Sequence, residues 1–142
     1  MTLKFLLDTN VVSEPLRLKP SDGVLRRLQL HADEMAIPSL VWHELRFGVE
    51  RLPPSRRRTT IEDYLERVVL ATMQILDYDA AAAAWHASER ARLAARGETP
   101  PFIDGQIAAI AHAHDLALVT FNIADFKRFN GIRVVNWALT SK

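Results

Sequence analysis

Five short apolar runs recur along this chain, and a stretch of helical character separates each run from the next. The runs cover residues 3–7, 34–37, 73–76, 117–120 and 132–135. Short strands that alternate with helices are joined by right-handed crossovers, which make neighbouring strands parallel. The sequence therefore predicts an α/β fold, with one parallel sheet flanked by helices on both faces.

Residues that commonly cap helices indicate where the helices are expected to begin. Pro53-Pro54 should end the helix that follows Ser39, and Gly97 should end an Ala-rich helix. The arginine-rich stretch around Arg56 is expected to be a loop, before a helix that opens with a capping box at Thr59. The residues expected to begin helices are Asn10 or Ser13, Ser21 or Asp22, Ser39, Thr59, Asp79 and Asp104.

The composition fits one globular domain, which we expect to span residues 1–142. Hydrophobic residues make up 49% of the chain and charged residues 25%, which is ordinary for a soluble domain. No apolar stretch reaches the ~20 residues that a membrane helix needs, and no signal peptide opens the chain. There is no cysteine for a disulfide or a thiolate metal site. We therefore expect a cytoplasmic protein with no membrane partner.

Four acidic residues stand where predicted strands end or where a helix lies beside them. Asp8 follows the first apolar run, and Asp125 follows the fourth. Asp104 begins a predicted helix, and Glu44 lies among apolar residues of another. The carboxyl ends of parallel strands meet at one crevice, where like charges repel unless a cation binds. Because Mg²⁺ and Mn²⁺ prefer carboxylate oxygens, the pattern predicts metal-dependent chemistry on phosphate.

Each of these acids has a simpler explanation when it is taken alone. Asp8 and Asp104 could be helix caps, although Thr9 and Asn10 could cap the first helix equally well. Asp125 belongs to an Asp-Phe pair of a kind that is common in loops. The set is stronger than its members, because one fold can bring all four acids to the same place.

Metal sites built on histidine fit the sequence less well. His43-Glu44 begins like the helix of a zinc protease, but the second histidine of that motif is missing. His112 and His114 are two residues apart on a predicted helix, so they point to different faces. The two histidines that we expect at surface or capping positions are His31 and His86.

Two groups of basic residues could form a rim that holds a phosphate backbone. A solvated helix end is the simpler interpretation of each group by itself. The first group is Arg51, Arg56, Arg57 and Arg58, and the second is Arg90, Arg92 and Arg96. The net charge of +1 adds no overall attraction to nucleic acid.

Two other folds that handle phosphate also gather acids at strand ends, but this chain lacks parts of each. A receiver-like domain has paired acids after its first strand and a lysine after its last. Here Asp8 stands alone after its strand, and Lys127 follows a different motif. A phosphatase of the haloacid dehalogenase type has Asp-x-Asp, whereas Asn10 occupies the second position.

Four segments at the candidate site stand in a fixed order along the chain. They are LDTNVVSE at residues 7–14, ELRFGV at 44–49, DGQIAA at 104–109 and LVTFNIADF at 118–126. This set resembles the PIN-domain nucleases, and most of all the VapC toxins of type II toxin–antitoxin systems. The Ser13-Glu14-Pro15 continuation is similar to the FitB-like branch. The resemblance covers nearly the whole chain and implies a parallel sheet flanked by helices, as the strand pattern also predicts.

The resemblance implies a metal-dependent endoribonuclease that uses Mg²⁺, with Mn²⁺ able to substitute. Its catalytic and metal-binding acids would be Asp8, Glu44, Asp104 and Asp125. Some relatives place the fourth acid where Asn122 stands here, and others rely on the acid of the Asp-Phe pair. An amide brings no charge, so Asp125 takes the fourth acidic role. The supporting residues would be Asn10, Thr120 and Asn122.

The resemblance also implies partners. The substrate would be RNA, steered by the first group of arginines. The protein would form a homodimer, and a cognate antitoxin would lay its C-terminal segment across the active-site groove. The helix surface around Trp42, Phe47 and Leu52 is apolar enough to receive that segment. The alternative is a catalytically inert PIN scaffold that binds RNA or protein, but the presence of the core acids favours an active nuclease.

Overall fold

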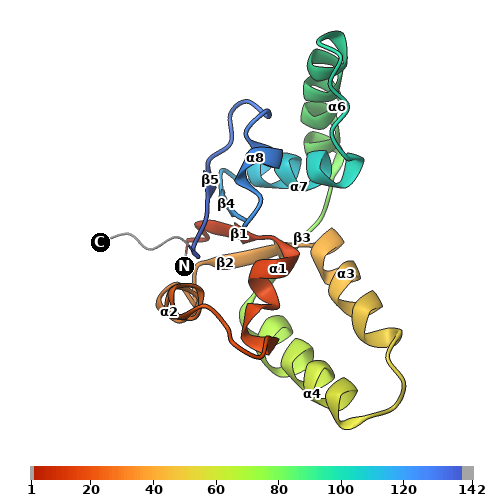
Figure 1. Cartoon of the computed structure of the whole chain (residues 1–142). Helices are drawn as coiled ribbons and strands as arrows, with labels where there is room; N and C mark the ends of the chain where they lie inside the picture. Colours follow the sequence, from red (N-terminus) through yellow and green to blue (C-terminus); the bar gives the residue numbers. More distant parts are fainter. Residues whose placement is uncertain (1, 139–142) are drawn as a thin grey trace.

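The structure, a computed structural model, describes residues 2–138 and contains a five-stranded sheet in the order β3-β2-β1-β4-β5 (Figure 1). Each neighbouring pair of strands is parallel, which confirms the predicted sheet. The strands are β1 (Phe5–Leu7), β2 (Met35–Pro38), β3 (Gln74–Leu76), β4 (Ala117–Val119) and β5 (Val134–Val135).

Helices cover both faces of the sheet, as predicted (Figure 1). One face carries α7 (Phe102–Ala113) and α8 (Ile123–Phe126), with α6 (Ala80–Ala95) packed on α7, and the other carries α1 (Thr9–Val12), α3 (Ser39–Glu50) and α4 (Arg56–Tyr64). None of the helices within residues 2–138 is long and apolar enough to cross a membrane. The remaining elements are η1 (Glu14–Leu16), α2 (Asp22–Leu30), the π-helical η2 (Leu65–Val69) and α5 (Leu70–Thr72).

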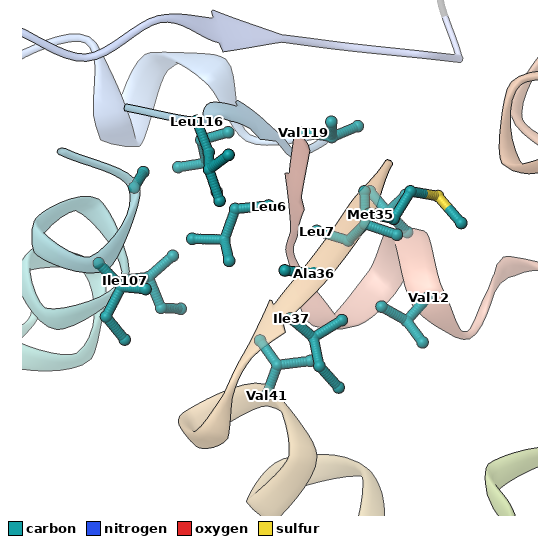
Figure 2. Close-up of a cluster of buried hydrophobic side chains, with 14 of the residues drawn as sticks. Leu6, Leu7, Val12, Met35, Ala36, Ile37, Val41, Ile107, Leu116 and Val119 are labelled. Atoms are coloured by element: carbon teal, nitrogen blue, oxygen red, sulfur yellow. The ribbon is translucent and has the colours of Figure 1, made fainter. Parts of the chain in front are cut away.

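The hydrophobic core lies against both faces of the central strand β1. Leu6 and Leu7 are therefore both fully buried. Figure 2 shows Leu6 directed toward Ile107 of α7, whereas Val12 of α1 lies on the other side of the strands. A strand buried on both faces has no polar side, which explains its uninterrupted apolar sequence. The first polar residue after it, Asp8, thus comes where the strand ends.

Prolines stand at the N-caps of α3 and α7, where polar caps were predicted. Ser39 is the first residue of α3, and Pro38 precedes it as the N-cap. Pro101 is the N-cap of α7, so Asp104 lies inside the first turn and does not open the helix. The fixed φ of proline suits the end of an extended segment. An acid in the first turn remains favourable because it faces the positive end of the helix dipole.

The helix α4 begins earlier than the sequence predicted. The Ser55 hydroxyl accepts a hydrogen bond from the Arg58 N–H at 3.1 Å, so Ser55 is the N-cap. The Thr59 hydroxyl instead donates to the Ser55 carbonyl at 3.1 Å. The predicted capping box at Thr59 is therefore wrong, and the stretch around Arg56 is helix and not loop. Arginine has a high helix propensity, so one suitable cap is enough to start the helix there.

The helices α6 and α7 pack closely around His86, which is only 3% exposed. The prediction of a surface or capping position was wrong for this histidine, although His31 does cap the C-terminus of α2. His86 Nδ1 shares a hydrogen bond with the Tyr78 hydroxyl at 2.9 Å. A Cβ on Gly105 would lie 2.0 Å from His86 Nε2, so α7 can approach the ring only because residue 105 is glycine.

Candidate active site

Asp8 is held at the carboxyl end of β1 by hydrogen bonds on three sides. Its N–H donates to the Val119 carbonyl of the neighbouring strand β4 at 3.0 Å. One carboxylate oxygen accepts from the Thr9 N–H at 2.8 Å, which makes Asp8 the N-cap of α1. The other oxygen accepts from the Thr120 hydroxyl at 2.9 Å. A carboxylate has about four lone-pair sites, so these two bonds leave it able to bind a further ligand.

Thr120, directly after the neighbouring strand β4, orients the Asp8 carboxylate. Its side chain is fully buried, and its hydroxyl also accepts a hydrogen bond from the Asn122 N–H at 3.1 Å. The structure thus places Thr120 beside Asp8. Asn10 is exposed, and within the described part of the chain no hydrogen bond joins it to Asp8. Thr9 and Thr120 therefore position Asp8 where the sequence suggested Asn10.

Asp104 experiences the charges of two other acids. Partial burial raises the pKa of its carboxyl above the ordinary value of 3.8, and the charges of Asp125 and then Asp8 raise it further. The Arg128 guanidinium acts in the opposite direction. Because Coulomb energies fall with distance, these effects indicate that Asp104 lies near both Asp125 and Asp8. The fold therefore brings Asp104, in the first turn of α7, toward Asp8 at the end of β1 and Asp125 in α8.

The last motif contributes a charge through Asp125. This residue lies in the first turn of α8 and is exposed. Asn122 stands one position before that helix, where its N–H donates to Thr120. Within this motif the charge that acts on Asp104 is that of Asp125, so the choice of Asp125 over Asn122 as the fourth acidic position stays the prediction.

Glu44 is not among the charges that act on Asp104. Its side chain on α3 is 47% exposed and lies 3.7 Å from His43 Nδ1. Within residues 2–138, no group of three or more acidic or histidine side chains is arranged to hold a metal ion. Mg²⁺, however, is usually held by one or two carboxylates together with waters and substrate phosphates. The oxygen donors of Asp8 and Asp104 fit that requirement, and a cation would relieve the repulsion among the acids.

An open groove of about 1190 Å³ lies beside Glu44, between η1, α3 and α4. Leu45, Val49 and Ile61 are among its apolar lining residues. Glu44 is the single acid among the described residues that line it. The basic lining residues are Arg17, Lys19, Arg51, Arg56 and Arg57. The groove therefore combines apolar walls with a strongly basic rim.

The arginines of the first basic group differ in what they contact. Arg58 Nη1 donates to the Leu52 carbonyl at 2.7 Å, and its Nε pairs with Glu62 at 3.1 Å. Arg58 therefore holds the turn between α3 and α4 and does not line the groove. The Arg51 guanidinium lies over the Phe47 ring, 4.8 Å from its centroid. Of the predicted RNA-binding residues, Arg51, Arg56 and Arg57 line the groove.

Two charged residues outside the groove, Arg128 and Glu89, were not singled out from the sequence. Arg128 acts on Asp104, and its place directly after the Asp-Phe-Lys segment of the last motif is the signal that could have identified it. Glu89 is 8% exposed and bonded to Arg92, one of the arginines that the sequence suggested as a basic rim. Its spacing of three residues from Arg92 on a helix is the corresponding signal.

Comparison with known proteins gives the family. Residues 5–132 match the family model of the PIN domain. The tRNA(fMet)-specific endonuclease VapC of Shigella flexneri is 36% identical over 137 residues, which cover 96% of this chain and 99% of that protein.

Solved structures are similar over the same length. The structure of FitAB bound to an IR36 DNA fragment contains a chain with a TM-score of 0.88 and 28% identity, covering 97% of this chain and 98% of that one. VapBC-5 of Mycobacterium tuberculosis, a member of the VapBC family of toxin–antitoxin systems, has a TM-score of 0.64 and 28% identity, with 95% and 96% covered. This chain therefore belongs to the PIN-domain family and, within it, to the VapC group.

Proposed function

We propose that this protein is a metal-dependent endoribonuclease toxin of a type II toxin–antitoxin system, which hydrolyses RNA phosphodiester bonds with Mg²⁺ or Mn²⁺. The observation that carries the proposal is the placing of Asp104 where the charges of Asp125 and Asp8 both act on it. A partly buried acid whose pKa is raised by neighbouring acids works against folding stability, and such groups cluster at functional sites. The VapC relative named as an endonuclease supports RNA as the substrate.

The residues of the site would divide the work among them. Asp8 and Asp104 would hold the cation, Asp125 would add a donor near a second position, and Glu44 would hold the attacking water or complete the set of donors. When bound there, Mg²⁺ or Mn²⁺ supplies Lewis-acid stabilisation of the charge that develops on the phosphate. Thr120 keeps the Asp8 carboxylate in one orientation, which matters because a shift of ~1 Å can cost ~100-fold in rate.

The groove would serve the partners. Arg51, Arg56 and Arg57 would steer RNA toward the acids, so that activity falls as salt rises. The same apolar walls and basic rim fit an antitoxin segment that carries apolar and acidic residues. The similarity to VapBC-5, a member of a toxin–antitoxin family, supports such a partner. An antitoxin in the groove would block RNA from reaching the site.

A homodimer in the cytoplasm completes the proposal. Phe102 and Ile103, at the start of α7, are 49% and 45% exposed. These two apolar side chains are suited to a contact between subunits. Light scattering of the purified protein should give twice the mass of 16.1 kDa. A single-chain mass at micromolar concentration would contradict this part of the proposal.

The main test is cleavage of total cellular RNA by protein freed of any antitoxin, with Mg²⁺, with Mn²⁺ and with chelator. We expect discrete new RNA ends that require metal and that disappear in Asp8→Asn. The matched control is Asp115→Asn, which removes an acid that is 98% exposed and pairs with Arg133. This control should cut RNA as the parent does.

The inert scaffold makes the opposite prediction. It gives no cleavage with either metal, and RNA binds equally well to the parent and to Asp8→Asn. That result would replace the nuclease with a binding module. Cleavage that persists in both Asp8→Asn and chelator would point to a contaminating nuclease and would remove the support for this site.

A further inference from the structure

A buried acid on α6 holds the loop that follows α8. One Glu89 oxygen accepts from Arg92 Nη2 at 2.8 Å and from the Asn130 N–H at 2.8 Å, and the other accepts from Arg92 Nε at 3.1 Å. Arg92 Nη2 also donates to the Arg128 carbonyl at 2.7 Å. Glu89 and Arg92 together thus bind the backbone on both sides of Phe129. We call these two residues the α6 clamp.

Two buried aromatic side chains also anchor the loop that follows α8. Phe126 and Phe129 flank Arg128 and are 2% and 4% exposed. Gly131 ends the segment with a φ of +80°, a conformation that residues with side chains rarely adopt. The backbone of Arg128 therefore lies between two buried aromatic anchors and is bonded to the α6 clamp. Because the backbone of Arg128 is fixed, the position of its Cα and Cβ atoms is fixed as well.

The Arg128 side chain has no partner of its own. It is partly buried, yet within residues 2–138 its guanidinium forms no hydrogen bond and no ion pair. Arg58 and Arg92, by contrast, are each bonded to carboxylates. Arg128 stands in the turn that follows α8, three residues after Asp125, so its side chain begins within one turn of that acid. The structure thus keeps an unpaired cation beside a group of acids without joining them in a salt bridge.

We propose that the Arg128 guanidinium binds a phosphate of the RNA beside the bond that is cut. This inference rests on the proposed function and adds a substrate contact to it. The phosphate is an anion that must approach three carboxylates, and a fixed cation offsets that repulsion. Guanidinium suits the task because its planar donors match two phosphate oxygens at once. The α6 clamp positions Arg128 and does not touch the substrate.

A simpler role for Arg128 is that it only neutralises part of the charge on the acids. The two roles differ in what they predict for RNA. A counter-ion would affect the stability of the metal-free protein and leave the number of phosphate contacts unchanged. A phosphate-binding residue would change the salt dependence of RNA binding.

The experiment compares Arg128→Ala and Arg128→Lys with the parent, and Lys127→Ala is the control. Lys127 is the preceding residue, exposed and cationic, and within residues 2–138 it forms no salt bridge with an acid. Metal-dependent cleavage of total RNA is measured for each protein. Affinity for a short labelled single-stranded RNA is measured against salt, with each change placed in an Asp8→Asn background so that the RNA stays intact.

We expect Arg128→Ala to lower cleavage about 100-fold, as loss of one charge-stabilising donor commonly does. Its plot of log affinity against log salt should become shallower by about 0.7, the value for one contact on single-stranded nucleic acid. Arg128→Lys should keep the slope and recover part of the cleavage, because lysine restores the charge but not the planar donors. Lys127→Ala should cut RNA at the parental rate.

Parental cleavage by Arg128→Ala would overturn the inference while leaving the proposed nuclease intact. An unchanged salt slope, with a lowered melting temperature that Mg²⁺ restores, would also overturn it and would establish the counter-ion role. If the parent itself neither cuts nor binds RNA, the proposed function fails first. The two failures are therefore distinguishable within one set of measurements.

Discussion

Two consecutive residues in the first turn of α7 face regions of opposite character. Asp104 lies where partial burial, and then the charges of Asp125 and Asp8, raise its pKa. Gly105 faces α6, where His86 is buried and hydrogen-bonded to Tyr78. The first region gathers like charges, and the second is packed and pairs its polar groups. One turn of helix thus joins a region suited to binding to one suited to stability.

The acids of the two regions show the same difference. Hydrogen bonds from Arg92 lower the pKa of Glu89 below its ordinary value of 4.5, although burial opposes them. Burial and neighbouring acids raise the pKa of Asp104. Ionisation therefore stabilises the fold at Glu89 and destabilises it at Asp104. The difference indicates that the strand-end acids are kept for what they bind.

Gly105→Ala should produce the largest effect, because it adds a methyl group to the packed region. The new Cβ would meet His86 Nε2 at 2.0 Å, so the helices must separate or the ring must move. We expect the free energy of unfolding, measured in urea, to fall by about 3 kcal/mol, the upper end for overpacking. Adding His86→Ala should recover part of that loss. Equal losses with and without His86 would contradict the proposed contact.

Glu89→Gln should produce the next largest loss of stability, because it removes a buried carboxylate that accepts three hydrogen bonds. We expect a loss of about 2 kcal/mol at pH 7, within the range for bonds to charged groups. The folded pKa is lowered, so this stability is present above pH 4.5 and is lost as pH falls through the folded value. In urea unfolding from pH 7 downward, the free energy of unfolding should fall less for the variant than for the parent. Parallel curves would contradict the role of the Glu89 charge.

The two kinds of arginine on α4 offer a smaller test of paired against unpaired charge. Arg58→Ala removes donors to the Leu52 carbonyl and to Glu62, so we expect a loss of about 1 kcal/mol. Arg57→Ala should leave stability within ~0.5 kcal/mol, as for most surface changes, but weaken RNA binding. Unfolding and RNA affinity are measured for both. The distinction fails if the two changes alter both properties equally.

The sequence predicted the sheet well because buried strands and helix caps are local signals. The apolar run before Asp8 and the Asp79 cap of α6 are both found in the structure. The start of α4 was missed because a row of arginines resembles a loop, although Ser55 supplied a cap. Local signals therefore predicted most of the fold. The prediction failed at α4, where an arginine-rich composition was taken to indicate a loop.

Long-range contacts set the limits of prediction at the site. Asp8 could be placed because its strand ends there, and Thr120 because the next strand ends beside it. The burial of His86 depends on Gly105, which lies nineteen positions later, so the residues near His86 give no sign of it. The position of Arg128 depends on Glu89 in another helix. These pairings come from tertiary packing alone.

The most direct test of the central claim is the melting temperature of the parent and of Asp104→Asn at pH 7, with chelator and with saturating Mg²⁺ or Mn²⁺. The folded pKa of Asp104 is raised, so the parent loses stability as pH rises above 3.8 toward that value and does not regain it. In chelator, Asp104→Asn should therefore melt above the parent. Metal should raise the melting temperature of the parent more than that of the variant, because a bound cation stabilises the folded state. A parent whose melting temperature is unmoved by metal would contradict the account.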